Sequence, residues 1–122
     1  MNIHDFLNSI EKQSVNTQFV DKLAEIYGAE LIEYVAKLLS TSSEGIFFES
    51  DDILRILSHK EILNASEELS VDFTGLQLIP IFDSGDNDYI VFDIEKSNWC
   101  KFNIVDSVQF KQKSLLSEFF RN

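Results

Sequence analysis

The stretch that decides the fold is residues 76–104, LQLIPIFDSGDNDYIVFDIEKSNWCKFNI. Its apolar residues fall in three runs rich in β-branched and aromatic types, at residues 76–82, 89–94 and 99–104. The segments between the runs, residues 83–88 and 95–98, have the Asp, Asn, Gly and Ser content of turns. We therefore expect three antiparallel strands joined by hairpins, as a meander. Pro80 should lie at a sheet edge or a bulge, because proline lacks the N–H that a central strand needs.

Upstream of this stretch the apolar residues have helical spacing. A first helix is predicted from the i, i+3, i+4, i+7 stripe formed by Ile3, Phe6, Leu7 and Ile10. A second should begin after Asn16 or Thr17 and end at Gly28, which is suited to a C-terminal cap. A third is expected over residues 29–39.

The segment between these helices and the strands predicts mixed structure. Residues 46–48, Ile-Phe-Phe, indicate a short strand. Residues 50–52 offer a cap for a short helix that includes Ile53, Leu54 and Leu57, and residues 61–69 extend or restart it. The tail, residues 113–120, returns to helical spacing. We expect one α+β domain over residues 1–122, with a central antiparallel sheet meander flanked by N-terminal and C-terminal helices.

The composition favours a folded protein without cofactors. Of the 122 residues 44% are hydrophobic, with eleven Phe, three Tyr and one Trp, which is enough to build a core. Cys100 is the single cysteine, so no internal disulfide is possible, which fits a reducing cytosol. The first residues predict no signal peptide, and no apolar run approaches the roughly 18 residues of a transmembrane helix.

The negative charge is concentrated in the middle of the chain. Residues 43–95 carry thirteen acids and two bases, whereas residues 96–122 carry two acids and five bases. The net charge of the whole chain is −11. Such a field repels nucleic acid and anionic lipid and speeds encounter with a basic protein partner. The alternative is that the acidity serves solubility alone.

The groups that could support catalysis are few. Residues 83–88 hold three carboxylates that could ligate Ca²⁺ or Mg²⁺, but their spacing does not match a calcium loop, and a hairpin turn explains them more simply. His4 and His59 have no ligand-like spacing, and Cys100 fits a buried strand position. We therefore expect neither enzymatic activity nor a bound metal.

Five stretches between residues 47 and 120 occur in a recognisable order: Phe47-Phe48, the SDDIL of residues 50–54, the helical stretch 61–69, the LIPIFDSGDNDYIVFD of residues 78–93 and the closing SLLSEFF of residues 114–120. In this order they resemble the SUKH superfamily, which includes fungal cell-wall synthesis regulators and bacterial immunity proteins. In place of the family's Leu-Pro step and Asn-Gly-Gly turn, this chain has GAEL at 28–31 and SSEG at 42–45. The resemblance implies a central antiparallel sheet flanked by helices, and a binding function that most often neutralises a toxin, frequently a nuclease.

The charge and the resemblance together predict an immunity protein that binds a basic toxin domain through an acidic surface. A nuclease holds a phosphate backbone, so its active face is usually basic and carboxylates would occlude it. The predicted contact residues are seven acids and one exposed aromatic anchor: Asp51, Asp52, Glu67, Glu68, Asp83, Asp86, Asp88 and Tyr89.

Two other functions stay open at this point. One is a regulatory or scaffolding module of the cell-wall-regulator type. The other is a hydrolase with a metal at residues 83–88. A homodimer formed through an apolar sheet edge or the Phe-rich tail is also compatible with the sequence.

Overall fold

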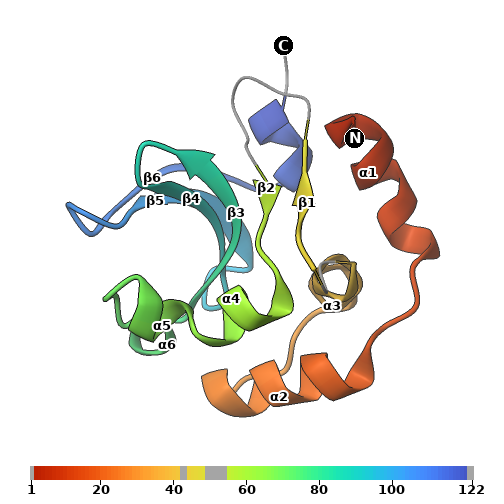
Figure 1. Ribbon diagram of the computed structural model, residues 1–122, viewed down its shortest axis with the longest axis horizontal. Helices are drawn as coiled ribbons and strands as arrows, with labels where there is room; N and C mark the ends of the chain where they lie inside the picture. Colours follow the sequence, from red (N-terminus) through yellow and green to blue (C-terminus); the bar gives the residue numbers. More distant parts are fainter. Residues whose placement is uncertain (1, 42–43, 49–54, 121–122) are drawn as a thin grey trace.

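The computed structural model describes residues 2–41, 44–48 and 55–120 and has an α+β fold (Figure 1). A six-stranded antiparallel sheet runs in the order β1-β2-β3-β4-β5-β6, so each strand pairs with its neighbour in sequence. The strands are β1 (Ile46–Phe47), β2 (Arg55–Ile56), β3 (Leu78–Gly85), β4 (Asp88–Asp93), β5 (Asn98–Asn103) and β6 (Val108–Lys113). The helices are α1 (Ile3–Ser9), η1 (Ile10–Lys12), α2 (Thr17–Tyr27), α3 (Glu33–Ser40), α4 (His59–Leu63), α5 (Ala65–Glu68), α6 (Phe73–Leu76) and η2 (Leu116–Phe120). The predicted fold class is confirmed.

The hairpin meander predicted from the sequence is present, with shifted boundaries. The first strand starts at Leu78 because Leu76 ends α6 and Gln77 adopts a left-handed conformation, with φ 59°. The register shifts between Pro80 and Phe82, so the proline lies at a bulge as one alternative predicted. As a whole β3 is a central strand, between β2 and β4, but β2 pairs with Phe82 and Asp83, so Pro80 is paired on the β4 side alone.

The first two helices form where the sequence predicts them. Asn16 caps α2 by accepting a hydrogen bond from the Phe19 N–H at 3.2 Å, and Gly28 ends it with φ 64°. The third helix begins at Glu33, so its predicted start at Ala29 is wrong. The Ala29 N–H donates a hydrogen bond to the Ala24 carbonyl at 3.1 Å. Because this bond belongs to the C-terminal cap of α2, Ala29 belongs to the end of that helix and does not begin the next one.

Four elements between Arg55 and Phe120 differ from expectation. The predicted helix through Leu57 is wrong, because Arg55 and Ile56 form β2, where Ile56 pairs with both Ile46 and Phe82. The predicted cap at residues 50–52, together with Ile53 and Leu54, lies outside the described residues. Helix α6 and strand β6 were not predicted, and the closing helix is a 3₁₀ helix, η2.

Helices cover both faces of the central strands. Side chains alternate along β4 and β5, so Phe92 and Trp99 point to one face of the sheet and Phe102 to the other. Phe102 packs against Phe73 of α6 with ring centroids 5.7 Å apart, and we call this side the α6 face. On the opposite side, the α3 face, Trp99 packs against Tyr34 of α3.

Helix α2 joins the two helical groups. Figure 1 shows it along the bottom of the molecule, beneath α3 and α4. Its Tyr27 hydroxyl donates to the Leu78 carbonyl at 2.8 Å, and its Phe19 ring stacks on His59 with centroids 3.6 Å apart. These two contacts attach α2 to the start of β3 and to α4.

Candidate partner-binding site

The acidic segment at residues 83–88 forms a tight hairpin turn between β3 and β4. Asp86 and Asn87 have φ values of 55° and 66°, and the flanking Gly85 and Asp88 are paired across the two strands. A two-residue hairpin of this kind needs positive φ at both central positions, which Asp and Asn tolerate. The turn chemistry therefore accounts for much of the local composition.

Two of the three carboxylates in this hairpin make bonds within the protein. Asp83 accepts a hydrogen bond from the Gly85 N–H at 2.9 Å, and its other oxygen lies 3.5 Å from Arg55. Asp88 accepts a hydrogen bond from the Asn103 side-chain amide at 2.9 Å. Asp86 at the tip is exposed. Of the three predicted contact acids here, Asp86 is thus the one that faces solvent most openly.

Arg55 connects Asp83 to helix α4 through Glu61. Its guanidinium lies 2.7 Å from the Glu61 carboxylate, and both side chains are about a quarter to a third exposed, at 24% and 34%. This hydrogen bond lowers the pKa of the Glu61 carboxyl. The three charges hold β2, β3 and α4 together on the α6 face.

Tyr89 corrects one expectation. It is only 9% exposed and lies in the core of the sheet, so the prediction that it is an exposed aromatic anchor is wrong. Burial raises the pKa of its phenol, and the nearby Asp83 adds to that shift. Tyr89 faces the same side of the sheet as its β3 partner Asp83, which is the α6 face.

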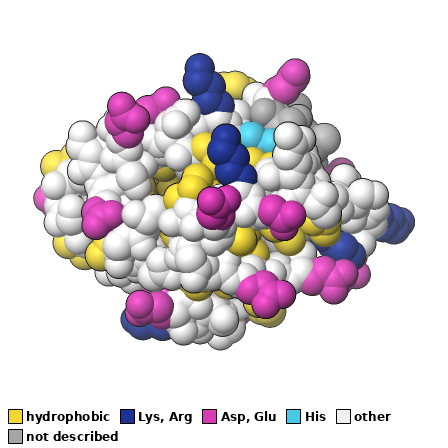
Figure 2. Space-filling model, turned by 90° about the horizontal axis from the view of Figure 1, so that it is seen from below, with side chains coloured by type: hydrophobic (Ala, Val, Ile, Leu, Met, Phe, Trp, Pro, Cys, Tyr) yellow, Lys and Arg dark blue, Asp and Glu magenta, His cyan; other side chains and the backbone are white. Residues whose placement is uncertain are grey.

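The remaining predicted acids do not join the hairpin in one cluster. Glu67 and Glu68 are exposed on α5, which packs beside α6 at the start of β3, whereas Asp86 follows the end of β3. The eight residues of β3 span roughly 25 Å from the start of the strand to its end. Asp51 and Asp52 lie outside the described residues. Figure 2 shows acidic side chains scattered over the face it presents, several of them beside a lysine or arginine, and not gathered into one patch.

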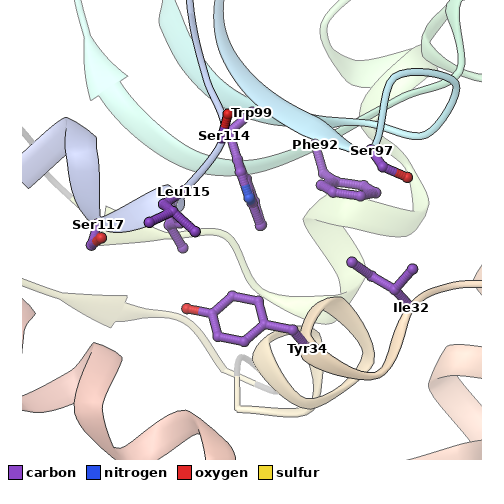
Figure 3. A pocket seen from close by; sticks show the side chains of 9 residues that line it. Ile32, Tyr34, Phe92, Ser97, Trp99, Ser114, Leu115 and Ser117 are labelled. Carbon is purple, nitrogen blue, oxygen red and sulfur yellow. The ribbon is translucent and has the colours of Figure 1, made fainter.

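A pocket of about 360 Å³ lies instead on the α3 face. Figure 3 shows Phe92 and Trp99 reaching it from the sheet, Ile32 and Tyr34 from the start of α3, and Leu115 from the segment before η2. Three serines, Ser97, Ser114 and Ser117, add hydroxyl groups to its lining. The pocket is thus apolar in its walls and able to form hydrogen bonds at a few points, as ligand pockets commonly are.

The aromatic side chains of the pocket are fixed by mutual packing. Trp99 meets Phe92 edge to face, with centroids 4.9 Å apart, and meets Tyr34 at 6.4 Å and 87°. Phe92 and Trp99 are 3% and 4% exposed, so they form the floor. Ile32 and Leu115 are 48% and 58% exposed, so they form an accessible apolar rim.

A second hollow, of about 320 Å³, is lined by Glu11, Glu33, Tyr34 and Lys37. Lys37 lies 3.2 Å from the Glu33 carboxylate one turn earlier in α3, and it donates to the Glu11 carbonyl at 2.9 Å. The Glu33 side chain remains 79% exposed. The hollow therefore has one lysine, two carboxylates and a negative formal charge.

Tyr34 lines both hollows and connects them. Burial raises the pKa of its phenol, and the carboxylate of Glu11 raises it further, so the hydroxyl stays protonated and able to donate. An apolar pocket with an acidic neighbour suits a ligand that carries an apolar group beside a cation. We call the two hollows together the Tyr34 site.

The described residues also bear on catalysis. Among residues 2–41, 44–48 and 55–120, no three His, Cys, Asp or Glu side chains are grouped so as to hold a metal ion. Cys100 is buried, its thiol donates to the Gln109 side chain at 3.8 Å, and burial raises its pKa to about 11, which disfavours the reactive thiolate. In the same part of the chain, every helix is too short or too polar to cross a membrane.

Sequence reasoning missed the Tyr34 site. Its lining comes from four separated segments, around residues 11, 32–37, 92–99 and 114–117. The one signal in the sequence was that it contains Tyr34 and Trp99, two aromatic residues of the kind that line binding pockets. Their positions in the sequence do not indicate that they meet in the fold. Comparison of the chain with protein-family models, curated proteins and solved structures gives no match.

Proposed function

We propose that this protein is an immunity-type binding protein of the SUKH kind, which neutralises a basic toxin domain, most simply a nuclease, by covering its active face. The observation that carries the proposal is the charge: the chain has a net charge of −11, and thirteen of its twenty-one acids lie in residues 43–95. The SUKH resemblance of the sequence adds to it, and the observed α+β fold agrees with that resemblance.

The exposed acids support long-range attraction of such a partner. Glu67, Glu68 and Asp86 are all exposed, and they lie at opposite ends of β3. Charges spread in this way create a broad negative field, which raises the rate of encounter with a basic surface. They are less suited to a single compact contact, because the hairpin carboxylates of Asp83 and Asp88 already have partners within the protein.

Tight binding needs a desolvated anchor as well as attraction. The Tyr34 site supplies a preformed apolar pocket whose aromatic floor is fixed by packing. Encounter through the field and retention through the pocket would together give the fast association and slow dissociation that neutralising a toxin requires.

The experiment uses the domain encoded at the 3′ end of the gene directly upstream of this one. We expect that domain to be basic, to bind the purified protein, and to lose its nuclease activity in the complex. Binding should weaken at least tenfold between about 50 and 500 mM salt, because screening shortens the range of the field. A matched control is the same domain titrated with a neutral protein of similar size.

Two outcomes would contradict the proposal. One is an upstream gene without such a domain. The other is a domain that neither binds this protein nor is inhibited by it at any salt concentration.

A further inference from the structure

We propose that the Tyr34 site binds a basic segment of the partner protein in which a large apolar side chain lies next to a lysine or arginine. This inference rests on the proposed function, and it identifies which surface makes the contact and what chemistry is recognised. It assigns the anchor to the α3 face of the sheet, on the side opposite Asp83 and Tyr89.

The apolar part of the argument is the shape of the larger hollow. Its volume of about 360 Å³ is at the lower end of ligand pockets, which is ample room for one large side chain. The floor of Phe92 and Trp99 is nearly buried, whereas Leu115 at the rim is 58% exposed. An apolar side chain entering here would remove the exposed apolar surface of this rim, Ile32 and Leu115, from water.

The cationic part of the argument is the smaller hollow on the other side of Tyr34. Glu11 and Glu33 place two carboxylates there, and Lys37 is already held by the Glu33 carboxylate and the Glu11 carbonyl. A second cation would therefore meet a net negative charge in the smaller hollow, whereas Lys113 is paired with Trp99 beside the larger one. The Tyr34 ring between the hollows offers a surface for the aliphatic part or the charged head of a lysine or arginine.

The charge of the whole chain selects a basic protein as the occupant. With a net charge of −11, the protein repels acidic proteins and nucleic acid, and two copies of it repel each other. A second copy could still offer its basic tail, residues 96–122, so self-association is kept as an outcome of the test.

The first experiment tests the recognised chemistry with a synthetic peptide, acetyl-Gly-Ser-Arg-Trp-Lys-Ser-Gly-amide, titrated into the ¹⁵N-labelled protein. We expect saturable shifts of the Trp99 indole N–H and of the Tyr34 and Leu115 amides. The dissociation constant should be on the order of 1 mM, because a short flexible peptide loses conformational freedom on binding. Peptides with alanine in place of tryptophan, or with glutamate in place of the two basic residues, should bind at least tenfold more weakly.

The second experiment uses matched variants of the protein. Leu115→Ser should weaken the peptide about tenfold, whereas Leu76→Ser, at an exposed leucine on α6, should leave binding unchanged. Glu33→Gln should weaken it about two- to threefold at low salt, whereas Asp106→Asn, at an exposed carboxylate between β5 and β6, should not.

Several results would overturn the inference. They are shifts that avoid Tyr34 and Trp99, equal binding of the alanine peptide, or shifts of these residues that depend on protein concentration without peptide, which would show a second copy in the site. If the upstream-encoded domain binds wild type and Leu115→Ser equally well, the site assignment fails while the proposed function stands. If that domain does not bind wild type at all, the proposed function fails whatever the peptide does.

Discussion

The β3–β4 hairpin and the Tyr34 site are both rich in groups that suggest binding, yet the structure uses them differently. In the hairpin, Asp83 and Asp88 are bonded to Arg55 and Asn103, and Asp86 and Asn87 form the turn itself. At the Tyr34 site, Leu115 and Glu33 remain exposed beside a rigid aromatic floor. This difference shows that a local cluster of acids can be structural, whereas the exposed groups of the proposed site come from segments distant in sequence.

The largest effect on stability is expected where the hairpin strand enters the core. Phe82 is fully buried and packs against the rings of Phe48 and Phe120, with centroids 6.2 and 5.9 Å away. Phe82→Ala should lower the free energy of unfolding by about 3–5 kcal/mol, measured by urea denaturation. Phe47→Ala is the control, because Phe47 is 74% exposed and should cost under about 0.5 kcal/mol. Equal losses for both variants would contradict the observed packing.

The next effect concerns the charges on the α6 face. Arg55→Met leaves Glu61 and Asp83 without their shared partner and should cost about 1–2 kcal/mol, between the values for exposed and buried pairs. Because Arg55 lowers the pKa of Glu61 below its ordinary 4.5, the pair stabilises the protein above about pH 5 and loses this contribution as pH falls through the lowered pKa. Unfolding measured from pH 3 to 7 should therefore show a flatter acid dependence in the variant. An unchanged slope would mean that protonation of Glu61 is not coupled to folding through Arg55.

A smaller effect is expected at the hairpin turn. Asn87 has φ 66°, so Asn87→Ala should cost about 1 kcal/mol, whereas Asn87→Gly should change stability by only a few tenths. Thermal unfolding of the two variants tests whether the positive φ of the turn, and not a contact of the asparagine side chain, determines how residue 87 affects stability. A larger loss for glycine than for alanine would contradict the turn assignment.

The smallest effect on stability is expected at the Tyr34 site. Leu115→Ser should change the free energy of unfolding by under about 0.5 kcal/mol, because Leu115 is more than half exposed. Leu76→Ser should behave the same way. If Leu115→Ser unfolded the protein, Leu115 would be a structural residue and its exposure would carry no meaning for binding.

Much of the fold could be predicted because its signals are local. The Asn16 and Gly28 caps and the apolar runs of the meander each lie within one element, so propensity and periodicity suffice. Strand β2 could not be predicted, because Ile56 becomes a strand residue only by pairing with Ile46 and Phe82. Strand β6 was missed because its residues, including Gln109, Lys111 and Gln112, are polar and mostly exposed, as suits an edge strand.

The candidate site was harder to predict than the fold. Acids are visible in a sequence, but whether a carboxylate is free or bonded depends on partners such as Arg55, 28 positions before Asp83. Tyr34 and Trp99 meet only because α3 packs on the same face of the sheet that β5 presents with Trp99. The spacing of residues along the chain does not reveal contacts of this kind between distant segments.

The most direct test of the central claim separates attraction from anchoring. The association and dissociation rates of the upstream-encoded domain are measured by surface plasmon resonance on wild type, on Leu115→Ser, and on the combined variant Glu67→Gln, Glu68→Gln and Asp86→Asn. We predict that Leu115→Ser raises the dissociation rate about tenfold with little change in association, and that the combined variant slows association severalfold at low salt with little change in dissociation. Faster dissociation of the combined variant, with Leu115→Ser behaving as wild type, would contradict the account and place the contact on the acidic residues.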